Sequence, residues 1–302
     1  MINFRYHVVT LVAVFLALGL GVLFGASFID QKTVTGLQRS QKSLAETNKT
    51  RRNQILSLQK DLNSLKSFAS VSRDLLIQGV LTDRPVVLVA FQSTPDQLVA
   101  ATEETLVGAG AKLEGSIEIS DALDLRTDDR RRKIASDLAL PAADPKGLTD
   151  DVVAGLTDAL SGRQPGFIQK LVDSGLASTG QPSGAQPKPA GELAEPGTAV
   201  VIVPPGVRDA SQKLLLLPLI KSLAAAPVLT ALTEPNSTPS VLMRAVRAEA
   251  TLKVVTIDGL DEPLGQAGLA LGLKAAFAGT YGHYGAGKGA TTLLPPAQTL
   301  PA

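Results

Sequence analysis

The longest hydrophobic stretch of the chain lies near its N-terminus. Between Arg5 and Asp30 it carries no charged residue apart from a histidine, His7. At about 1.5 Å per residue, a helix of that length crosses the ~30 Å hydrocarbon core of a bilayer. A cleavable secretory segment is usually shorter and ends in a small-x-small site, which residues 25–27 match only loosely. We therefore predict a retained transmembrane anchor over residues 1–29.

The charges that flank this stretch leave its orientation open. Arg5 precedes it, whereas Lys32, Arg39 and Lys42 follow it, so the positive-inside count is ambiguous. Only a few residues precede the stretch, and the remainder of the chain has the pattern of a secreted folded domain. We therefore predict that the N-terminus is cytoplasmic and that the bulk of the chain is extracytoplasmic.

Small residues recur at every fourth position of the predicted anchor: Ala13, Ala17, Gly21 and Gly25. Such spacing leaves a shallow groove on one face of a helix, and a second helix can approach that groove closely. Small residues are also common in apolar spans, so the motif is not specific. We expect these four positions to pair two copies of the anchor.

A second pattern, with a period of seven, extends between Asp30 and Gly79, where the chain has no proline. This a/d heptad pattern predicts a coiled-coil helix over residues 30–79. The a positions are Val34, Gln41, Asn48, Ile55, Leu62, Ala69 and Leu76, and the d positions are Leu37, Leu44, Arg51, Leu58, Leu65 and Ser72.

The seam of this predicted coil is uneven. Its apolar half consists of Ile55, Leu58, Leu62 and Leu65, and its polar positions are Gln41, Asn48 and Arg51. Buried polar residues at such positions cost stability but select register and partner. The seam therefore predicts a parallel homodimer stalk or, alternatively, a weak self-association that yields to the helix of another protein.

From Pro85 onward, apolar β-branched runs alternate with helical patterns. This alternation predicts an α/β fold with a Rossmann-like parallel sheet covered on both faces, spanning residues 80–302. A Pro/Gly/Ser-rich segment at about 178–197 lacks apolar periodicity and predicts a long, exposed, disordered loop. The expected strands are 85–91, 112–119, 198–205, 227–232 and 252–257, and the expected helices begin near residues 94, 128, 148, 166, 208, 239 and 263.

Composition narrows the classes of function. The net charge of +1, the absence of Trp and an aromatic content of 4% argue against a nucleic-acid-binding surface. The chain has no Cys, which excludes disulfides and zinc–thiolate sites. A secreted fold of this size does not need disulfides, so the compartment stays open on this ground.

No motif in the chain predicts catalysis or a bound cofactor. The expected first strand runs into FQSTPDQ, in which Ser93 or Thr94 is placed as a helix N-cap, and no G-x-G-x-x-G follows it. The segment GHYGAGKG (282–289) resembles a P-loop, but Gly289 stands where a magnesium-binding Ser or Thr belongs. We interpret it as a turn whose aromatic residues pack on the sheet, and RTDDRRRK (126–133) as a solvated helix start or, alternatively, an anion-binding run.

Four stretches together resemble the actinobacterial MctB family over essentially the whole chain. They are the N-terminal MINFRYHVVTLVAVFLALGLGVLFG, the coil, the PVVLVAF strand and the terminal GTYGHYGAGKGATTLLPP. Members are called copper transport outer-membrane proteins, and corynebacterial ones are also described as SteB, a cell-separation factor. The resemblance implies an envelope protein, in the cytoplasmic membrane or an outer envelope layer. It also implies one of two roles, either copper homeostasis or a scaffold that pairs with a SteA-like membrane protein and with the coiled coil of a peptidoglycan hydrolase.

The residues weigh against a copper site in a single copy. Copper(I) prefers Cys, Met or His ligands, and this chain offers Met1, Met243, His7 and His283, which lie far apart in sequence. Only His283 stands as a candidate ligand, contributed by several subunits. The pattern also lacks the repeated alternating strands of a membrane barrel. We therefore expect a non-enzymatic scaffold without a cofactor, with copper as the alternative.

Overall fold

A computed structural model shows the chain as two compact units, one formed by Met1–Leu65 and one by Lys66–Ala302. Each unit is described by itself. The structure describes residues 4–27, 31–141, 144–164, 166–181, 188–205, 210–236 and 240–296.

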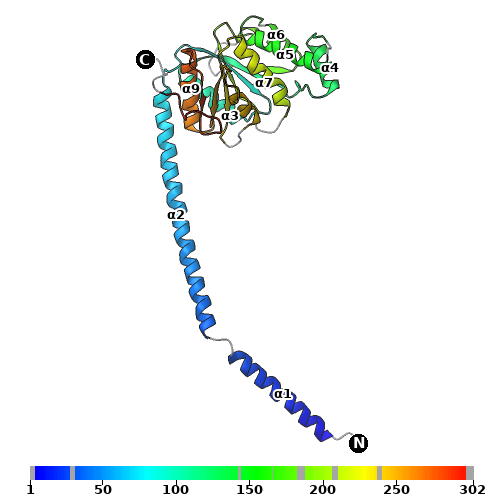
Figure 1. Ribbon diagram of the computed structural model, residues 1–302, viewed down its shortest axis with the longest axis vertical. Coiled ribbons are helices and arrows are strands. Elements are labelled where there is room, and N and C mark those ends of the chain that lie inside the picture. The colour runs from blue at the N-terminus through cyan, green and yellow to red at the C-terminus, as the bar shows by residue number, and fades with distance from the viewer. Residues whose placement is uncertain are drawn as a thin grey trace. The chain divides into compact units, whose positions relative to one another are not determined.

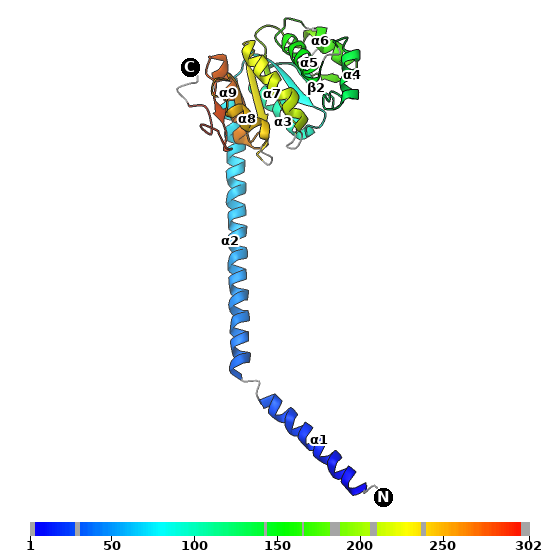
Figure 2. The same ribbon diagram turned by 45° about the vertical axis from the view of Figure 1, so that its right-hand side comes forward.

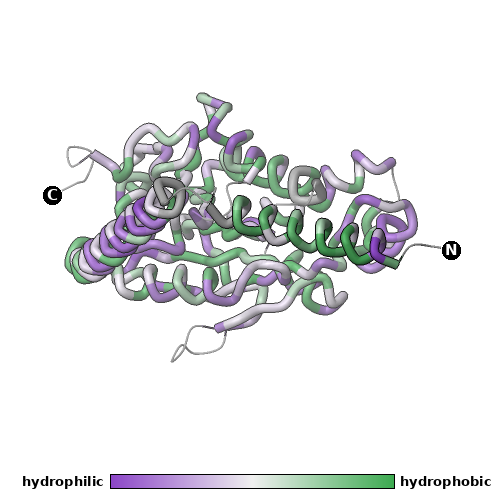
Figure 3. Tube along the Cα trace, turned by 90° about the horizontal axis from the view of Figure 1, so that it is seen from below, coloured by the Kyte–Doolittle hydropathy of each residue, from purple (hydrophilic) through white to green (hydrophobic). Residues whose placement is uncertain are grey.

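The first unit consists of two helices. Helix α1 (Phe4–Ser27) is, among the described residues, the one helix long and apolar enough to cross a membrane. Figure 3 shows it as an almost continuous hydrophobic tube. Helix α2 (Gln31–Ile77) runs without interruption for 47 residues and continues into the second unit. Both helices lie where the apolar run and the heptad pattern predict them.

The second unit is built on a seven-stranded sheet in the order β3-β2-β1-β4-β5-β6-β7. Its strands are parallel except β3, which is antiparallel to β2. The mostly parallel α/β class is therefore confirmed. The strands are β1 (Pro85–Phe91), β2 (Lys112–Ile119), β3 (Ala177–Gly180), β4 (Ala199–Ile202), β5 (Thr230–Glu234), β6 (Val255–Asp258) and β7 (His283–Tyr284).

Helices cover both faces of the sheet, because its central strands are apolar on both sides. Figures 1 and 2 show α3 and α9 beside the end of α2, and α5 beside α7. Two hydrophobic clusters, one on each face, form the core. The helices of this unit are α3 (Asp96–Gly108), α4 (Asp128–Asp137), α5 (Pro145–Leu160), α6 (Gly166–Asp173), α7 (Ala210–Ala225), α8 (Val241–Arg247) and α9 (Pro263–Phe277), with a 3₁₀ turn, η1 (Ala190–Glu192).

The last turns of α2 belong to this second unit and pack on its helices. The Ile77 side chain is only 2% exposed and joins the core cluster that contains residues of α3 and α9. Lys66 pairs with Glu262 at 3.2 Å, and Arg73 donates a hydrogen bond to Gln266 of α9. Burial of Ile77 and these polar contacts hold this end of α2 on the sheet domain.

The loop predicted at 178–197 begins too early and is not exposed throughout the part that the structure describes. Strand β3 begins at Ala177 and pairs with β2, and beyond it Ala190 and Leu193 are buried. The prediction missed β3 because an edge strand is paired on one side only and needs no apolar alternation. Residues 182–187 of this expected loop lie outside the described part of the chain.

Candidate functional site

In an open α/β sheet, ligands bind outside the carboxyl ends of the strands where the strand order reverses, which here is between β1 and β4. At this point Thr94, 5% exposed, accepts a hydrogen bond from the Phe91 amide at 3.2 Å. The Thr94 hydroxyl also donates to the carbonyl of Val203, just after β4, at 3.2 Å. The side chain thereby ties the ends of the two strands together.

The role predicted for this threonine is therefore wrong. Helix α3 begins at Asp96, and its N-cap is Pro95, with no side-chain capping bond. The Thr94 hydroxyl is committed to the chain ends of the two strands, where a nucleotide-binding turn would need open backbone amides.

A buried ion pair occupies the carboxyl end of β6. Arg247, in the last turn of α8, donates to Asp258 at 2.8 Å, and the two side chains are 2% and 4% exposed. The same guanidinium donates to the Thr256 hydroxyl at 2.9 Å and to the Tyr284 carbonyl at 3.0 Å. Every bond of this arginine joins α8 to β6 or to the C-terminal segment.

The glycine-rich segment 282–289 wraps around the same carboxylate. The amides of Ala286 and Gly287 donate to Asp258 at 2.7 Å and 3.1 Å. Gly285 has a φ of +122°, and a Cβ there would lie 2.1 Å from an Asp258 oxygen. These amides bind a carboxylate of the chain itself, so the likeness to a P-loop reflects a structural loop. As predicted, its aromatic residues pack on the sheet, where His283 and Tyr284 form β7.

His283, the candidate copper ligand, borders this cluster. Its Nδ1 lies 3.0 Å from the Thr256 hydroxyl. Burial, and to a smaller extent the charge of Arg247, lower the pKa of His283, which favours the neutral imidazole that a metal requires. Among the described residues, however, no three His, Cys, Asp or Glu side chains come together in a group that could hold a metal ion.

Glu234 closes the carboxyl end of β5 in a similar way. Its side chain is 4% exposed and accepts a hydrogen bond from the Ser240 amide at 2.8 Å. Burial raises the pKa of Glu234 in spite of that bond. A perturbed carboxyl can mark a catalytic acid, but this one binds the backbone of Ser240, the N-cap residue of α8.

The basic run at 126–133 is neutralised within its own neighbourhood. Arg132 pairs with Asp129 at 3.1 Å, Lys133 pairs with Asp137 at 2.6 Å, and Arg131 pairs with Asp128. The hydrogen bond from Arg126 is the main cause that lowers the pKa of Asp124, which Arg130 also contacts. These pairs support a solvated helix start rather than an anion-binding run.

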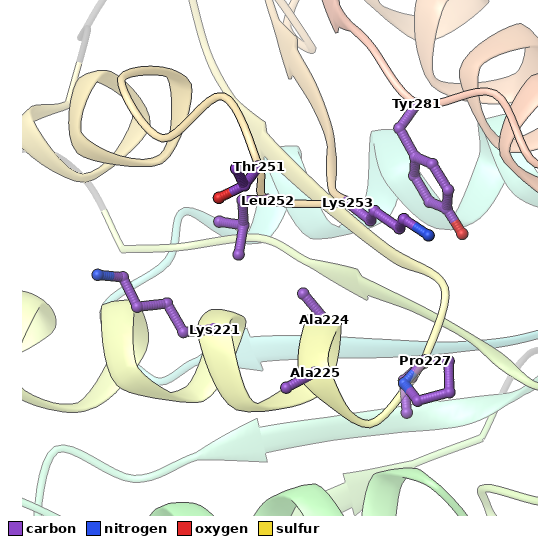
Figure 4. Close-up of a pocket in the computed structure, with 9 residues that line it drawn as sticks. Lys221, Ala224, Ala225, Pro227, Thr251, Leu252, Lys253 and Tyr281 are labelled. Carbon is purple, nitrogen blue, oxygen red and sulfur yellow. The ribbon is translucent and has the colours of Figure 1, made fainter.

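Two open pockets lie on the second unit. The first, of about 550 Å³, lies at the amino edge of the sheet, between the end of α7 and the residues that precede β6. Figure 4 shows Lys221, Lys253 and Tyr281 around it. Lys221 pairs with Glu249 at 2.5 Å. The second pocket, of about 490 Å³, is lined by Leu125, which precedes α4, and by residues of α4, α5 and α7 that include Arg131 and Leu214.

The residues expected to mediate association lie on α1 and α2, outside the sheet domain. In α1, Ala13, Ala17, Gly21 and Gly25 are all exposed in the single chain. In α2 the apolar seam is exposed as well: Ile55 54%, Leu58 67%, Leu62 52% and Leu65 65%. The polar seam residues Gln41, Asn48 and Arg51 are also exposed. Pairing through these residues stays a prediction.

Comparisons with known proteins cover almost the whole chain. A family model described as "Copper transport outer membrane protein, MctB" matches residues 1–295. The chain belongs to the MctB family. Proteins named Copper transporter MctB from Mycobacterium tuberculosis and Mycobacterium bovis are 22% identical to it over 310 residues, which is 97% of this chain and 99% of each relative. The protein of that name from Mycobacterium leprae is 24% identical over 98% of this chain.

Sequence reasoning gave Thr94 a different role and missed the buried pair of Arg247 and Asp258. One signal was available for the last of these. Asp258 directly follows the predicted strand LKVVTI and precedes a glycine, a pattern that places a carboxylate at the carboxyl edge of a parallel sheet. Its partner was hidden because Arg247 looks like any basic residue in the last turn of a helix.

Proposed function

We propose that this MctB family member is a non-enzymatic, membrane-anchored scaffold of the cell envelope that recruits partners through α2. The observation that carries the proposal is the exposed apolar seam of α2. Ile55, Leu58, Leu62 and Leu65 lie at successive a and d positions and are each more than half exposed in the single chain. Burial of such a side chain is worth about 1.5–3 kcal/mol, so the seam favours a helical partner.

The polar, N-terminal part of the seam supports a selective partner rather than the strongest possible dimer. Asn48 and Arg51 place polar groups where a coil would bury them, which weakens self-association and selects the register. By family resemblance, the partners that we propose are a SteA-like membrane protein and the coiled coil of a peptidoglycan hydrolase. The scaffold would thereby act in cell separation, with α1 holding it at the membrane.

The sheet domain supports a non-enzymatic role. Thr94, Glu234 and Asp258 stand at the carboxyl ends of β1, β5 and β6, where an α/β enzyme would bind its ligand. Each of them bonds to backbone of its own chain. In this proposal the domain serves as a rigid body that the end of α2 carries.

The names of the relatives favour a second candidate, copper homeostasis. The mycobacterial relatives are named as copper transporters over almost the whole length of this chain. His283 is the one histidine outside the anchor, and its depressed pKa suits a metal ligand. A copper site would need His283 from more than one copy, because soft ligands are scarce in each.

A complementation experiment separates the two candidates. A deletion strain would receive the wild-type chain or the double variant Leu58→Asp and Leu62→Asp, and cell separation and cell-associated copper would be measured together. The matched control is Ser57→Asp and Asn63→Asp, which adds the same charges to the same turns outside the seam. We expect the seam variant to fail in separation with normal copper, and the control to complement fully.

Two results would count against the scaffold. Normal separation in the seam variant would show that the seam recruits nothing needed for it. Copper accumulation in seam-variant cells that separate normally would favour copper homeostasis as the function. In that case His283→Ala should reproduce the accumulation, whereas Tyr281→Phe, two residues away, should leave copper unchanged.

A further inference from the structure

We propose that two copies of α2 stay paired as far as the sheet domain. In this pairing, Phe68 and Leu75 of one copy are covered by the side of α2 that, in the second copy, faces its own sheet domain. This inference deepens the proposed function and rests on its self-association through α2. It adds an interface that the a/d pattern does not contain. The occupant is a second copy of this chain, in a parallel arrangement.

The first observation is a change of residue type at the g positions, which precede each a position. The g positions of the lower heptads are polar: Ser40, Thr47, Gln54 and Asp61. In the last two heptads they become Phe68 and Leu75, which are 71% and 74% exposed. The change to large apolar residues coincides with the start of the second unit at Lys66.

The second observation concerns what the domain of the same chain already covers. Lys66 and Arg73 occupy successive e positions, and they bind Glu262 and Gln266. Ile77, at a b position on the same side, is buried. The domain therefore takes the e side of α2 and leaves the g side, with Phe68 and Leu75, uncovered in the single chain.

Coiled-coil geometry then connects the two sides. In a parallel two-stranded coil, a g residue of one helix lies against the e residue five positions later on the other helix. Phe68 of one copy thus meets the apolar stem of Arg73 of the other, whose guanidinium is bound to Gln266 of α9. Between these flanks the seam positions are small, Ala69 and Ser72, so the two helices can approach closely.

Two features identify the occupant as a second copy in parallel register. Each copy carries α1 at the same end of α2, so two copies in one membrane enter the coil side by side from that end. The same g-to-e rule places Asp61 of one copy against Lys66 of the other, which is an attractive pair. An antiparallel helix would not make this pairing.

Cysteine cross-linking in membranes tests the inference, because the natural chain has no cysteine. Three single variants of the full-length chain would be oxidised in native membranes. Arg51→Cys probes a d position of the lower coil, Ser72→Cys probes a d position of the domain-bound end, and Ser67→Cys at an f position is the outward-facing control. We expect disulfide-linked dimers from the first two variants and at least tenfold less dimer from the control.

Each other outcome has a distinct meaning. Cross-linking of Arg51→Cys without cross-linking of Ser72→Cys would overturn the inference, because the two helices would then pair around residue 51 but be apart at the end bound to the sheet domain. Failure of both would remove the self-association on which the inference rests. Equal cross-linking of Ser67→Cys would show random collision and would also overturn it.

A second measurement tests the flank itself. Adding Phe68→Ser to the Ser72→Cys chain should slow its cross-linking several-fold. The control is Val107→Ser, which changes another exposed apolar residue, on α3 and 56% exposed, and should leave the rate unchanged. A cross-linking rate that Phe68→Ser leaves unchanged would show that a second copy does not cover Phe68.

Discussion

Arg247 and Asp258 form an ion pair that is almost completely withdrawn from water, with 2.8 Å between the guanidinium nitrogen and the carboxylate oxygen. Asp258 also accepts the backbone amides of Ala286 and Gly287, so both charges are hydrogen-bonded as well as paired. The pair links α8, β6 and the C-terminal segment at the sheet edge where other α/β proteins bind ligands. The glycine-rich segment 282–289 therefore stabilises the fold.

Removing one partner of this pair should strongly destabilise the protein. Asp258→Asn leaves Arg247 buried without a counter-charge, which typically costs about 3–5 kcal/mol. The matched control is Asp129→Asn, because Asp129 and its partner Arg132 are both largely exposed. Thermal unfolding of the full chain in detergent should show a large fall in Tm for the first variant alone. Equal Tm values for the two variants would contradict the structural role of the pair.

Gly285 should be the least replaceable glycine of the C-terminal segment. Alanine there must adopt a φ of +122° and place its Cβ 2.1 Å from the Asp258 carboxylate. Gly279→Ala is the control, because Gly279 has a φ of +86° but open space around a Cβ. We expect about 1–2 kcal/mol from backbone strain in the control and a larger loss in Gly285→Ala. Limited proteolysis should also cut the C-terminal segment faster in Gly285→Ala, and equal rates would count against the contact.

Most of the fold could be predicted from the sequence because its signals are local. The strand predicted at 85–91 is observed at Pro85–Phe91, and the helix predicted from residue 263 is observed at Pro263–Phe277. An apolar β-branched run and a proline at a helix start are read from consecutive residues. The short strands β3 and β7 were not predicted from the sequence, because they are defined by pairing with a neighbouring strand rather than by their own composition.

The polar cluster could not be predicted for a different physical reason. Arg247, Asp258 and Ala286 come from three separate segments, and only the packing of α8 and the C-terminal loop on β6 brings them together. Thr94 shows the same limit, since its partner Val203 lies 109 residues away in the chain. A local N-cap signal was visible at Thr94, but the long-range bond determines its role.

Acidification should weaken the protein through His283. Burial and the nearby Arg247 lower the pKa of this imidazole below its ordinary value of 6.5. The unfolded chain therefore takes up this proton first, so stability falls as the pH drops from about 6.5 towards the lowered pKa. The difference in Tm between the wild type and His283→Gln should shrink over that window. Both chains retain His7, so its titration cancels, and a constant difference would contradict the assignment.

The apolar seam of α2 should control association in solution. Leu58→Asp and Leu62→Asp together remove two apolar side chains per helix from the proposed interface. Because four leucines leave the dimer interface, at about 1.5–3 kcal/mol for each buried leucine, the dimer should weaken by roughly 10,000-fold or more. Sedimentation of residues 31–302 measures this directly, with Ser57→Asp and Asn63→Asp as the control. An unaltered mass in the seam variant would remove the seam assignment.

The small residues of α1 should control association in the membrane independently of α2. Gly21 and Gly25 lie four residues apart, and a Cβ at either position meets no other atom of the single chain. Replacing both with leucine keeps the helix apolar but fills the groove through which a second helix would approach. A membrane two-hybrid assay on α1 alone should lose most of its signal in this variant. Gly19→Leu, which lies off the four-residue spacing, should keep the signal. If both variants keep it, α1 serves as an anchor only, and α2 must supply the pairing.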